Sequence, residues 1–355
     1  MSSGLERMRI ALVESGSEKN FAAGFASALS SRGIEYGYVD VSNSAIVEIL
    51  KEYDGLMWHF AQGLVVDYLM AKPLLSALEA SGFPVFPPVS DIWHFDDKLA
   101  QKYLLEAIAA PTPQTWIFYD RSAALRWLAN WPKPLVLKLR GGAASSNVKL
   151  ISNNLRGRRL VRKCFWPGYR QFDRIALARD EVIKVKSPSL TAIFNAARAI
   201  GKIFLHSPYE KVRGRERGYV LMQEFLPGNE FDTRIVVVGQ RAFGLRRFNR
   251  PGDFRASGSG FLDFDEKEIS SEAVSTAFKI AKILGTSCLA FDFLFRAGRH
   301  MEIAEISFGF VASAYRNCTG YWDERGCWHQ SKFPKGAFQL EDFIVDDFIA
   351  RIKTK

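Results

Sequence analysis

Residues 289–307, LAFDFLFRAGRHMEIAEIS, decide the fold, because they read as two β-strands joined by a short turn. The flanking runs are apolar and alternating, and a glycine lies in the segment between them, as is typical of a hairpin. A four-residue loop at 296–299 places Asp292 opposite Ile303 and makes Glu305 its diagonal neighbour. We therefore expect Asp292 and Glu305 on one face of a sheet, close enough to share a divalent cation.

The same alternation assigns the other polar residues of the hairpin to faces. Ser307 falls on the face of Asp292, whereas Glu302 falls on the opposite face and is the less suitable ligand. A change of register by one residue reverses this choice. A pair of acids on a strand is more commonly a solvated sheet face. As a metal site, it would suit Mg²⁺, which takes its remaining ligands from water and phosphate.

The composition is that of a folded globular protein. The chain has 355 residues, 48% of them hydrophobic and 24% charged, which excludes collagen-like, coiled-coil and mainly disordered classes. This length suggests two or three domains. The net charge of +10 favours an anionic partner, which could be a nucleotide, a nucleic acid or a membrane surface.

Three features that the sequence lacks indicate the cellular compartment. No apolar run is long enough for a membrane span, and the N-terminus has no signal-peptide core. The four cysteines form no C-x-x-C pair. We therefore expect a cytoplasmic protein without structural zinc or disulfides.

Two further stretches bear on the architecture. Residues 10–86 alternate short apolar runs with helical periods, which predicts a β-α-β-α-β order, a parallel sheet and a domain ending near residue 90. Lys138 ends an apolar strand and is followed by GGAASS at 141–146, a turn whose backbone N–H groups could bind phosphate. A flexible hairpin turn with a solvated lysine has the same appearance.

Seven segments in order resemble the ATP-grasp superfamily over residues 84–310. They are Asp97-Lys98, Lys138 with its glycine loop, QEFLPG at 223–228, Asp232-Thr233-Arg234, Gly252-Asp253-Phe254-Arg255, Asp292, and Glu305-Ile306-Ser307. The Asp-Thr-Arg and Gly-Asp-Phe-Arg segments are most similar to the branch of the ribosomal-protein glutamate ligase and glutathione synthetase. The resemblance implies an α/β (α+β) fold, with a Rossmann-like domain at 1–90 and two α+β subdomains, 91–222 and 223–355, that clasp ATP.

The resemblance also implies roles for individual residues. Lys98 and Lys138 would contact the phosphates, the segment around 224–226 the adenine, and Glu230 the ribose. The full set expected to bind ATP is Lys98, Lys138, Gly141, Gly142, Ser145, Ser146, Gln223, Glu224, Phe225, Leu226, Glu230 and Asp232.

The catalytic and metal-binding residues follow from the same motifs. Arg234, Arg247 and Arg255 would face the transferred phosphoryl group or the acceptor carboxylate, since planar guanidinium groups suit oxyanions. Asp292, Glu305 and Ser307 would hold two Mg²⁺ ions, with Mn²⁺ as an alternative. The family usually has Asn where this chain has Ser307, and this branch has Asn where it has Ser257. Both differences bear on the acceptor side of the site.

The implied reaction is ADP-forming ligation of a carboxylate to an amine through an acyl phosphate. The region after 305 resembles proteins of surface-polysaccharide gene clusters, which suggests an amino acid or a uronate as substrate. His59 ends a strand of the first domain, where an acceptor could bind, although a structural histidine is the more common case. We expect a small anionic carboxylate, an amine and ATP as partners, no nucleic acid, and a dimer as the working oligomeric state.

One segment lies outside these motifs. Residues 156–174 contain seven basic side chains and one acidic one, with Trp166 and Tyr169 among them. A solvated helix face is the usual explanation, and a landing site for an anionic acceptor is the alternative. A different class of function, nucleic-acid or anionic-membrane binding, would use this segment but leaves Asp292, Glu305 and both lysines unexplained. A third possibility is an ATP-grasp protein that binds nucleotide without catalysis, which Ser307 and Ser257 prompt.

Overall fold

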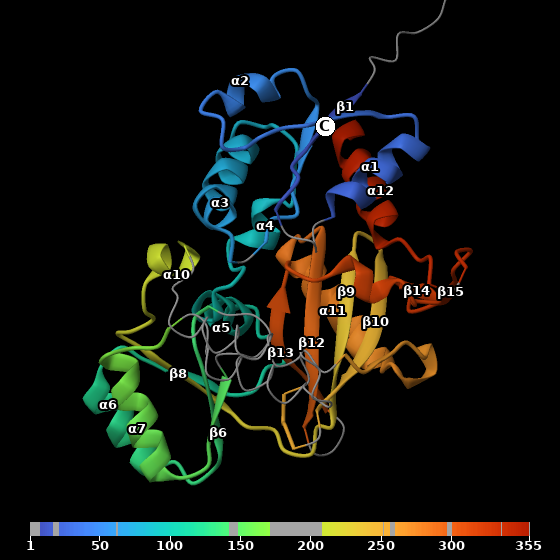
Figure 1. Ribbon diagram of the computed structural model, residues 1–355. Helices are drawn as coiled ribbons and strands as arrows, with labels where there is room; N and C mark the ends of the chain where they lie inside the picture. Colours follow the sequence, from blue (N-terminus) through green and yellow to red (C-terminus); the bar gives the residue numbers. More distant parts are fainter. Residues whose placement is uncertain are drawn as a thin grey trace, which may run out of the picture. The chain divides into compact units, whose positions relative to one another are not determined.

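The computed structural model describes residues 8–16, 21–61, 63–141, 148–170, 208–250, 252–255, 260–296, 300–334 and 336–354. The chain divides into two compact units (Figure 1). Unit 1 comprises Met1–Phe95, Ala107–Pro111 and Gly228–Lys355, and unit 2 comprises Asp96–Glu106 and Thr112–Pro227. The division at 90 and 222 expected from the sequence stays a prediction.

The N-terminal part of unit 1 is a parallel sheet of four strands in the order β2-β1-β3-β4. Its strands are β1 (Arg9–Leu12), β2 (Glu35–Tyr38), β3 (Gly55–Met57) and β4 (Val85–Phe86). The helices between and after them are α1 (Ala22–Ser31), α2 (Ile46–Leu50), α3 (Val65–Ala80) and α4 (Val89–Ile92). The predicted alternation of strands and helices is confirmed, but the observed order is β-α-β-α-β-α-β, which has one helix and one strand more than predicted.

The C-terminal part of unit 1 is a seven-stranded sheet in the order β13-β12-β9-β10-β14-β15, with β11 paired to β10. Its strands are β9 (Phe231–Val238), β10 (Arg241–Phe248), β11 (Leu262–Asp263), β12 (Cys288–Arg296), β13 (His300–Ser307), β14 (Gly320–Asp323) and β15 (Trp328–Gln330). Helix α11 (Ser271–Leu284) packs against β9, β10 and β12, and α12 (Leu340–Lys353) packs against α1.

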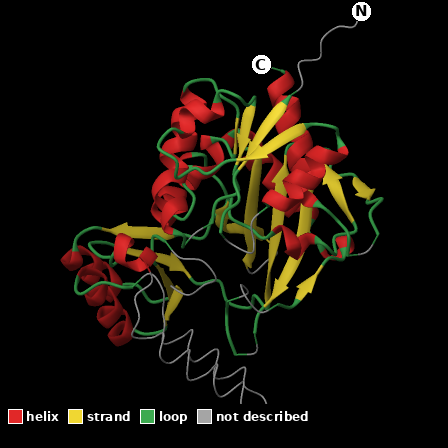
Figure 2. Ribbon diagram, turned by 45° about the horizontal axis from the view of Figure 1, so that its top comes forward, coloured by secondary structure: helices red, strands yellow, loops and turns green. Residues whose placement is uncertain are grey.

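Unit 2 is built on an antiparallel sheet in the order β5-β8-β6-β7. Its elements are α5 (Lys98–Ala107), β5 (Thr115–Phe118), α6 (Arg121–Ala129), β6 (Leu135–Lys138), β7 (Val148–Ile151), α7 (Asn154–Phe165), α10 (Pro208–Arg213) and β8 (Val220–Glu224). Helices α6 and α7 pack against each other and lie on one side of the strands (Figure 2). Between helices and sheet lies one apolar cluster that includes Leu128, Leu137, Ile151, Val161 and Met222.

The register of the decisive hairpin differs from the prediction. Arg296 pairs with His300, so β12 and β13 approach one residue closer to the turn than expected, and the residues between them lie outside the described part. The register shifts again between Phe293, which pairs with Ile303, and Asp292, which pairs with Glu305. The predicted pairing of Asp292 with Ile303 is therefore wrong, because the strands begin to pair one residue closer to the turn and β13 then contains a β-bulge.

The closer register at the turn also changes the position of Glu302. This residue pairs with Leu294, which lies on the same face of β12 as Asp292. The prediction that Glu302 faces away from Asp292 and Glu305 is therefore wrong. Within the described residues, no helix combines the length and the apolar character needed to cross a bilayer.

Candidate functional site

Three strands of the large sheet bring two aspartates and two arginines together on one face. Arg234 of β9 is the cross-strand partner of Asp292 on β12, and Asp232 of β9 is the partner of Arg247 on β10. Because residues two apart on a strand share a face, all four side chains point to the same side of the sheet. The spacing Asp232-Thr233-Arg234 is the sequence signal for this arrangement.

The four side chains form one hydrogen-bonded network. Arg234 donates from Nε to Oδ1 of Asp292 at 2.6 Å and from Nη2 to Oδ2 at 2.7 Å. Arg247 donates from Nε and Nη2 to the two carboxylate oxygens of Asp232, at 2.7 and 2.6 Å. The same Nη2 of Arg247 also lies 2.7 Å from Oδ2 of Asp292 and so joins the two pairs. Such forked contacts fix the planes of the guanidinium groups.

The network is buried, and its formal charges cancel. The Arg247 side chain is 11% exposed and that of Arg234 is 17% exposed. Burial by itself would raise the pKa of Asp292, but the charges of Arg234 and Arg247 and the hydrogen bonds from them outweigh it and hold this pKa below its usual range. Asp292 is therefore a carboxylate throughout the physiological pH range.

The β-bulge completes this face by placing Glu305 directly opposite Asp292. Ser307 pairs with Ala290 and continues along the same face, with its Oγ 3.4 Å from the carbonyl oxygen of Gly309. Glu302 shares the face but is occupied, since both of its carboxylate oxygens accept hydrogen bonds from Arg296. The structure therefore brings Asp292, Glu305 and Ser307 into one row.

The donor set of this row suits Mg²⁺ better than a metal held by protein ligands alone. Among the described residues, no group of three or more His, Cys, Asp and Glu side chains is arranged as a metal site. Asp292 and Glu305 supply carboxylate oxygens, and the oxygens of Asp292 already accept three N–H groups from arginine. Such a pair fits an ion that completes its shell with water and phosphate oxygens.

Two residues expected to bind ATP, Lys138 and Gln223, lie on the face of the unit 2 sheet opposite α6 and α7. Leu137 packs against the helices, so its neighbour Lys138 points to the other face. Gln223 lies on this face as well, paired with Thr115, and its Nε2 donates to Oγ1 of Thr115 at 3.0 Å. The sequence could not show which face of this sheet the helices cover.

Lys98 begins helix α5 and is itself buried. The carboxylate of Asp97 accepts hydrogen bonds from the backbone N–H groups of Leu99 and Ala100, which caps the helix. The backbone N–H of Lys98 donates to the carbonyl oxygen of Arg140 at 2.8 Å. This bond ties the start of α5 to the residue that precedes the glycine segment.

Gly141 is held close to an arginine that the sequence did not suggest. A Cβ at this position would lie 2.0 Å from Nη2 of Arg213. Arg213 is itself bonded to Asp96, Tyr209 and Glu216 and is buried, so it cannot easily move away. A side chain at position 141 would therefore displace Arg213 from these partners.

The remaining segment expected to contact adenine lies at the end of β8. The backbone N–H of Glu224 donates to the carbonyl oxygen of Gln114, and that of Phe225 donates to the carbonyl oxygen of Pro134. Leu226 is buried. In unit 1, the carbonyl oxygen of Glu230 accepts from the backbone N–H of Asn249 at 2.8 Å. These hydrogen bonds involve backbone atoms only, so the contacts of this segment with ATP stay predictions.

Arg255 does not join the network of Arg234 and Arg247. Its guanidinium binds the carboxylate of Asp253, with Nη2 to Oδ2 at 2.7 Å. Four predicted residues lie outside the described part of the chain: Gly142, Ser145, Ser146 and Ser257.

His59 lies in an aromatic cluster. Its ring stacks on Phe21 with centroids 3.7 Å apart and also contacts Phe308 and Phe310. Its Nε2 has no hydrogen-bond partner among the described residues. Burial lowers the pKa of His59 to about 3, so the ring is neutral at physiological pH. The packing role weighed in the sequence analysis matches this environment.

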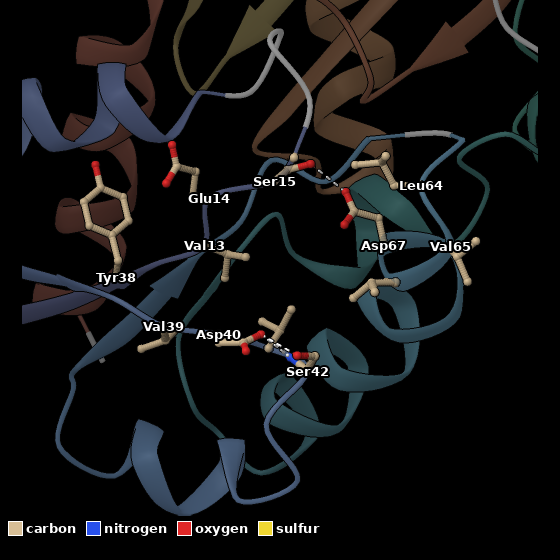
Figure 3. A pocket seen from close by; sticks show the side chains of 13 residues that line it. Val13, Glu14, Ser15, Tyr38, Val39, Asp40, Ser42, Leu64, Val65 and Asp67 are labelled. Atoms are coloured by element: carbon tan, nitrogen blue, oxygen red, sulfur yellow. Dashed lines mark hydrogen bonds between the residues drawn. The ribbon is translucent and has the colours of Figure 1, made fainter. Parts of the chain in front are cut away.

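A cavity of about 620 Å³ lies at the carboxyl ends of β1 and β2 (Figure 3). Parallel sheets commonly bind ligands at this edge. Among the described residues, its lining includes the carboxylates of Glu14, Asp40 and Asp67 and no Lys, Arg or His side chain. Asp67 accepts hydrogen bonds from Oγ of Ser15 at 2.8 Å and from the N–H of Ala61 at 2.6 Å.

No family model and no curated protein matches this chain. Several solved structures match it in fold. A RimK domain protein ATP-grasp from Sphaerobacter thermophilus DSM 20745 is 17% identical with a TM-score of 0.56, over 96% of this chain and 98% of that one. D-alanine–D-alanine ligase from Bacillus anthracis is 13% identical with a TM-score of 0.53, over 98% and 99%. The ATP-grasp ligase PsnB, complexed with a minimal precursor, Mg and ADP, is 14% identical with a TM-score of 0.54, over 97% and 98%. At these identities, the likeness is one of fold along the whole chain.

Proposed function

We propose, from the fold that this chain shares with ATP-grasp ligases, that it is an ATP- and Mg²⁺-dependent carboxylate–amine ligase that releases ADP. The observation that carries the proposal is the row of Asp292, Glu305 and Ser307 beside the largely buried arginines Arg234 and Arg247. Catalysis of phosphoryl transfer depends mainly on positioning and on charge stabilisation, and this row supplies both.

The arginines have the chemistry required for an anionic transition state. Arg247 is fixed by two carboxylates and Arg234 by one, so neither guanidinium has to reorganise when charge develops nearby. In the proposal, they face the transferred phosphoryl group or the acceptor carboxylate. Arg255, which is paired with Asp253, is assigned to the acceptor side.

Magnesium would be held by Asp292 and Glu305, with Ser307 at the end of the row, and would neutralise phosphate charge. Lys98, Lys138 and the segment after Gly141 would bind the phosphates, and the residues from Gln223 to Leu226 would bind the adenine. The number of ions and the use of Mn²⁺ belong to this proposal as well.

The substrates proposed are a small carboxylate, which is activated as an acyl phosphate, and an amine that attacks it. The attack forms the C–N bond and releases inorganic phosphate, so the products are an amide, ADP and phosphate. An amino acid or a uronate of a surface polysaccharide is the proposed carboxylate. The proposed setting is the cytoplasm, and the proposed oligomeric state is a dimer.

The test is a trapping experiment with the purified chain. Hydroxylamine replaces the unknown amine and converts an acyl phosphate into a hydroxamate, so the carboxylates can be screened first. We expect hydroxamate and phosphate to form in equal amounts from ATP in the presence of Mg²⁺, and neither to form with EDTA. If the chain binds no Mg·ATP by calorimetry, it is not a ligase of this kind. If it binds ATP but no carboxylate in a broad panel yields hydroxamate, the non-catalytic alternative is favoured.

A further inference from the structure

Helix α7 presents a face that carries only positive charge. At about 100° per residue, its five basic residues fall within a sector of about 160°, and Leu155 and Trp166 fall in the same sector. All seven side chains are exposed. The basic residues are Arg156, Arg158, Arg159, Arg162 and Lys163. We call this sector, with its two apolar residues, the basic face of α7.

The basic face has no carboxylate partner in the described part of the chain. No ion pair within 4.0 Å involves any of its five cations, and α7 contains no acidic residue. Like charges three or four residues apart, such as Arg158 with Arg162 and Arg159 with Lys163, destabilise a helix, and Arg156 opposes the helix dipole in the first turn. A solvated face usually mixes both signs, so this pattern indicates a partner.

The basic face does not belong to the proposed nucleotide site. The opposite side of α7, with Val161 and Cys164, packs into the apolar cluster of unit 2. Gly157 allows this close approach, because a Cβ there would lie 2.7 Å from Leu128 and 2.9 Å from Ile151. Lys138 lies on the far face of the sheet from α7. The basic face therefore points away from the residues expected to bind ATP.

Two large apolar side chains lie among these charges. Leu155 is 84% exposed at the start of α7, and Trp166 is 71% exposed at its end. They lie at opposite ends of α7, about three turns of helix or roughly 16 Å apart, and Trp166 is the C-cap with an extended backbone. The guanidinium of Arg217 lies 5.5 Å from the ring of Trp166, which adds a cation beside it.

The neighbouring helix extends the surface. Arg121 and Arg126 of α6 are exposed and also have no ion-pair partner within the described ranges. Helices α6 and α7 pack against each other and form the helical layer on one face of the sheet of unit 2 (Figure 1). This is a broad surface on rigid elements.

We propose that this layer is a peripheral docking surface for an anionic lipid bilayer. Basic side chains are attracted to anionic headgroups, and tryptophan and leucine beside them can enter the interfacial region. The phosphates of a nucleic acid would also attract these charges, but a nucleic acid has no apolar region that would bury Leu155. Proteins that bind single-stranded nucleic acid usually stack several aromatic rings on the bases, whereas this surface has one aromatic ring. The lipid surface accounts for both the charged and the apolar side chains.

The test is co-sedimentation of the full chain with vesicles, without ATP or substrates, so its outcome is independent of the proposed ligase activity. We expect binding to phosphatidylcholine vesicles that contain 30% phosphatidylglycerol and almost none to pure phosphatidylcholine. The variant Arg158→Glu/Arg159→Glu/Arg162→Glu should bind at least about 100-fold more weakly at low salt. The matched control is Lys279→Glu/Lys282→Glu/Arg325→Glu, which reverses three exposed charges in unit 1 and should bind within about threefold of the wild type.

Trp166→Ala separates the apolar contribution from the electrostatic one. We expect it to bind roughly tenfold more weakly, by a factor that changes little between 50 and 300 mM salt, whereas the effect of the charge reversal shrinks. Circular dichroism and melting temperature verify that each variant is folded. Equal binding to neutral and anionic vesicles, wild-type binding by the folded triple variant, or tighter binding to an oligonucleotide than to anionic vesicles would each overturn the proposal.

Discussion

Asp292 and Glu305 lie directly opposite each other on β12 and β13 because Ala304 is an extra residue in β13. Without this bulge, the register that pairs Phe293 with Ile303 would place Ala304 opposite Asp292. The bulge also leaves Glu302 on the same face. This strand thus offers two glutamates to one side of the sheet, one of them already bound by Arg296.

The two glutamates provide a matched pair of variants. We expect Glu305→Gln to lower kcat for hydroxamate formation at least about 100-fold, since it removes a carboxylate ligand of the proposed metal. Glu302→Gln should lower kcat less than about fivefold, because Arg296 occupies this side chain. The measurement is the Mg²⁺ dependence of turnover. Equal damage by both variants would contradict the assignment of Glu305 alone as the ligand.

Arg247 should matter for stability as well as for activity. Arg247→Ala leaves Asp232 and part of Asp292 buried without their counter-charge, which costs about 3–5 kcal/mol of the free energy of unfolding. Urea denaturation measures this change. Arg325→Ala, at an exposed side chain, should change it by no more than about 0.5 kcal/mol. The double variant Arg247→Ala/Asp232→Ala should recover part of the loss, and if it recovers none, the two residues are not coupled.

Lys138 and Lys149 lie on adjacent strands of the unit 2 sheet but on opposite faces. Lys138→Ala should weaken Mg·ATP binding roughly 10- to 100-fold, because a phosphate contact of about 1.5–3 kcal/mol is lost. Lys149, which lies 5.7 Å from the ring of Tyr169, serves as the control, and Lys149→Ala should leave the affinity within about twofold. Calorimetry gives both values. Equal losses would indicate a general charge effect and no specific contact by Lys138.

Gly141 should not tolerate a side chain. Gly141→Ala places a methyl group against the guanidinium of Arg213, which Asp96 and Glu216 hold in place. We expect a lower melting temperature, by about 2–4 °C for each kcal/mol lost. Gly16→Ala is the control, since a Cβ there meets no atom within 4 Å. A wild-type melting temperature for Gly141→Ala would mean that Arg213 moves aside freely.

Asp91 should make stability depend on pH. Burial raises the pKa of Asp91 to about 7, although it accepts hydrogen bonds from Ser287 and the N–H of Cys288. The carboxyl group of Asp91 loses its proton near pH 4 in the unfolded chain and near pH 7 in the folded chain. The contribution of Asp91 to the free energy of unfolding is therefore full below pH 4 and falls as the pH rises to 7.

The variant Asp91→Asn cannot lose this proton. Relative to the wild type, its free energy of unfolding should therefore increase between pH 4 and pH 7 and stay level above that. Urea denaturation at several pH values measures the difference. Glu48→Gln, at an exposed carboxylate paired with Lys51, should show no such trend. A constant difference between Asp91→Asn and the wild type at all pH values would contradict the raised pKa.

The sequence by itself determined the elements and their order. The apolar periods predicted the hairpin of β12 and β13, the strand that ends at Lys138 and the alternation of strands and helices over residues 10–86, and the structure contains all three. Local propensity and the burial of one face fix such elements, and both are written in adjacent residues. The order of the motifs likewise identified the fold. Short elements with weak periodicity, such as α2 and β15, escaped prediction.

The tertiary structure alone decided the chemistry of the site. Pairing across strands brings Arg234, Arg247 and Asp232 onto Asp292, and the side-chain period of two gives no information about a bulge at Ala304. The contact of Arg213 with Gly141 joins residues far apart in the chain. Register and long-range charge pairing depend on which strands become neighbours. The neighbours are fixed only in the folded sheet, where burial of one face against the core selects the pairing.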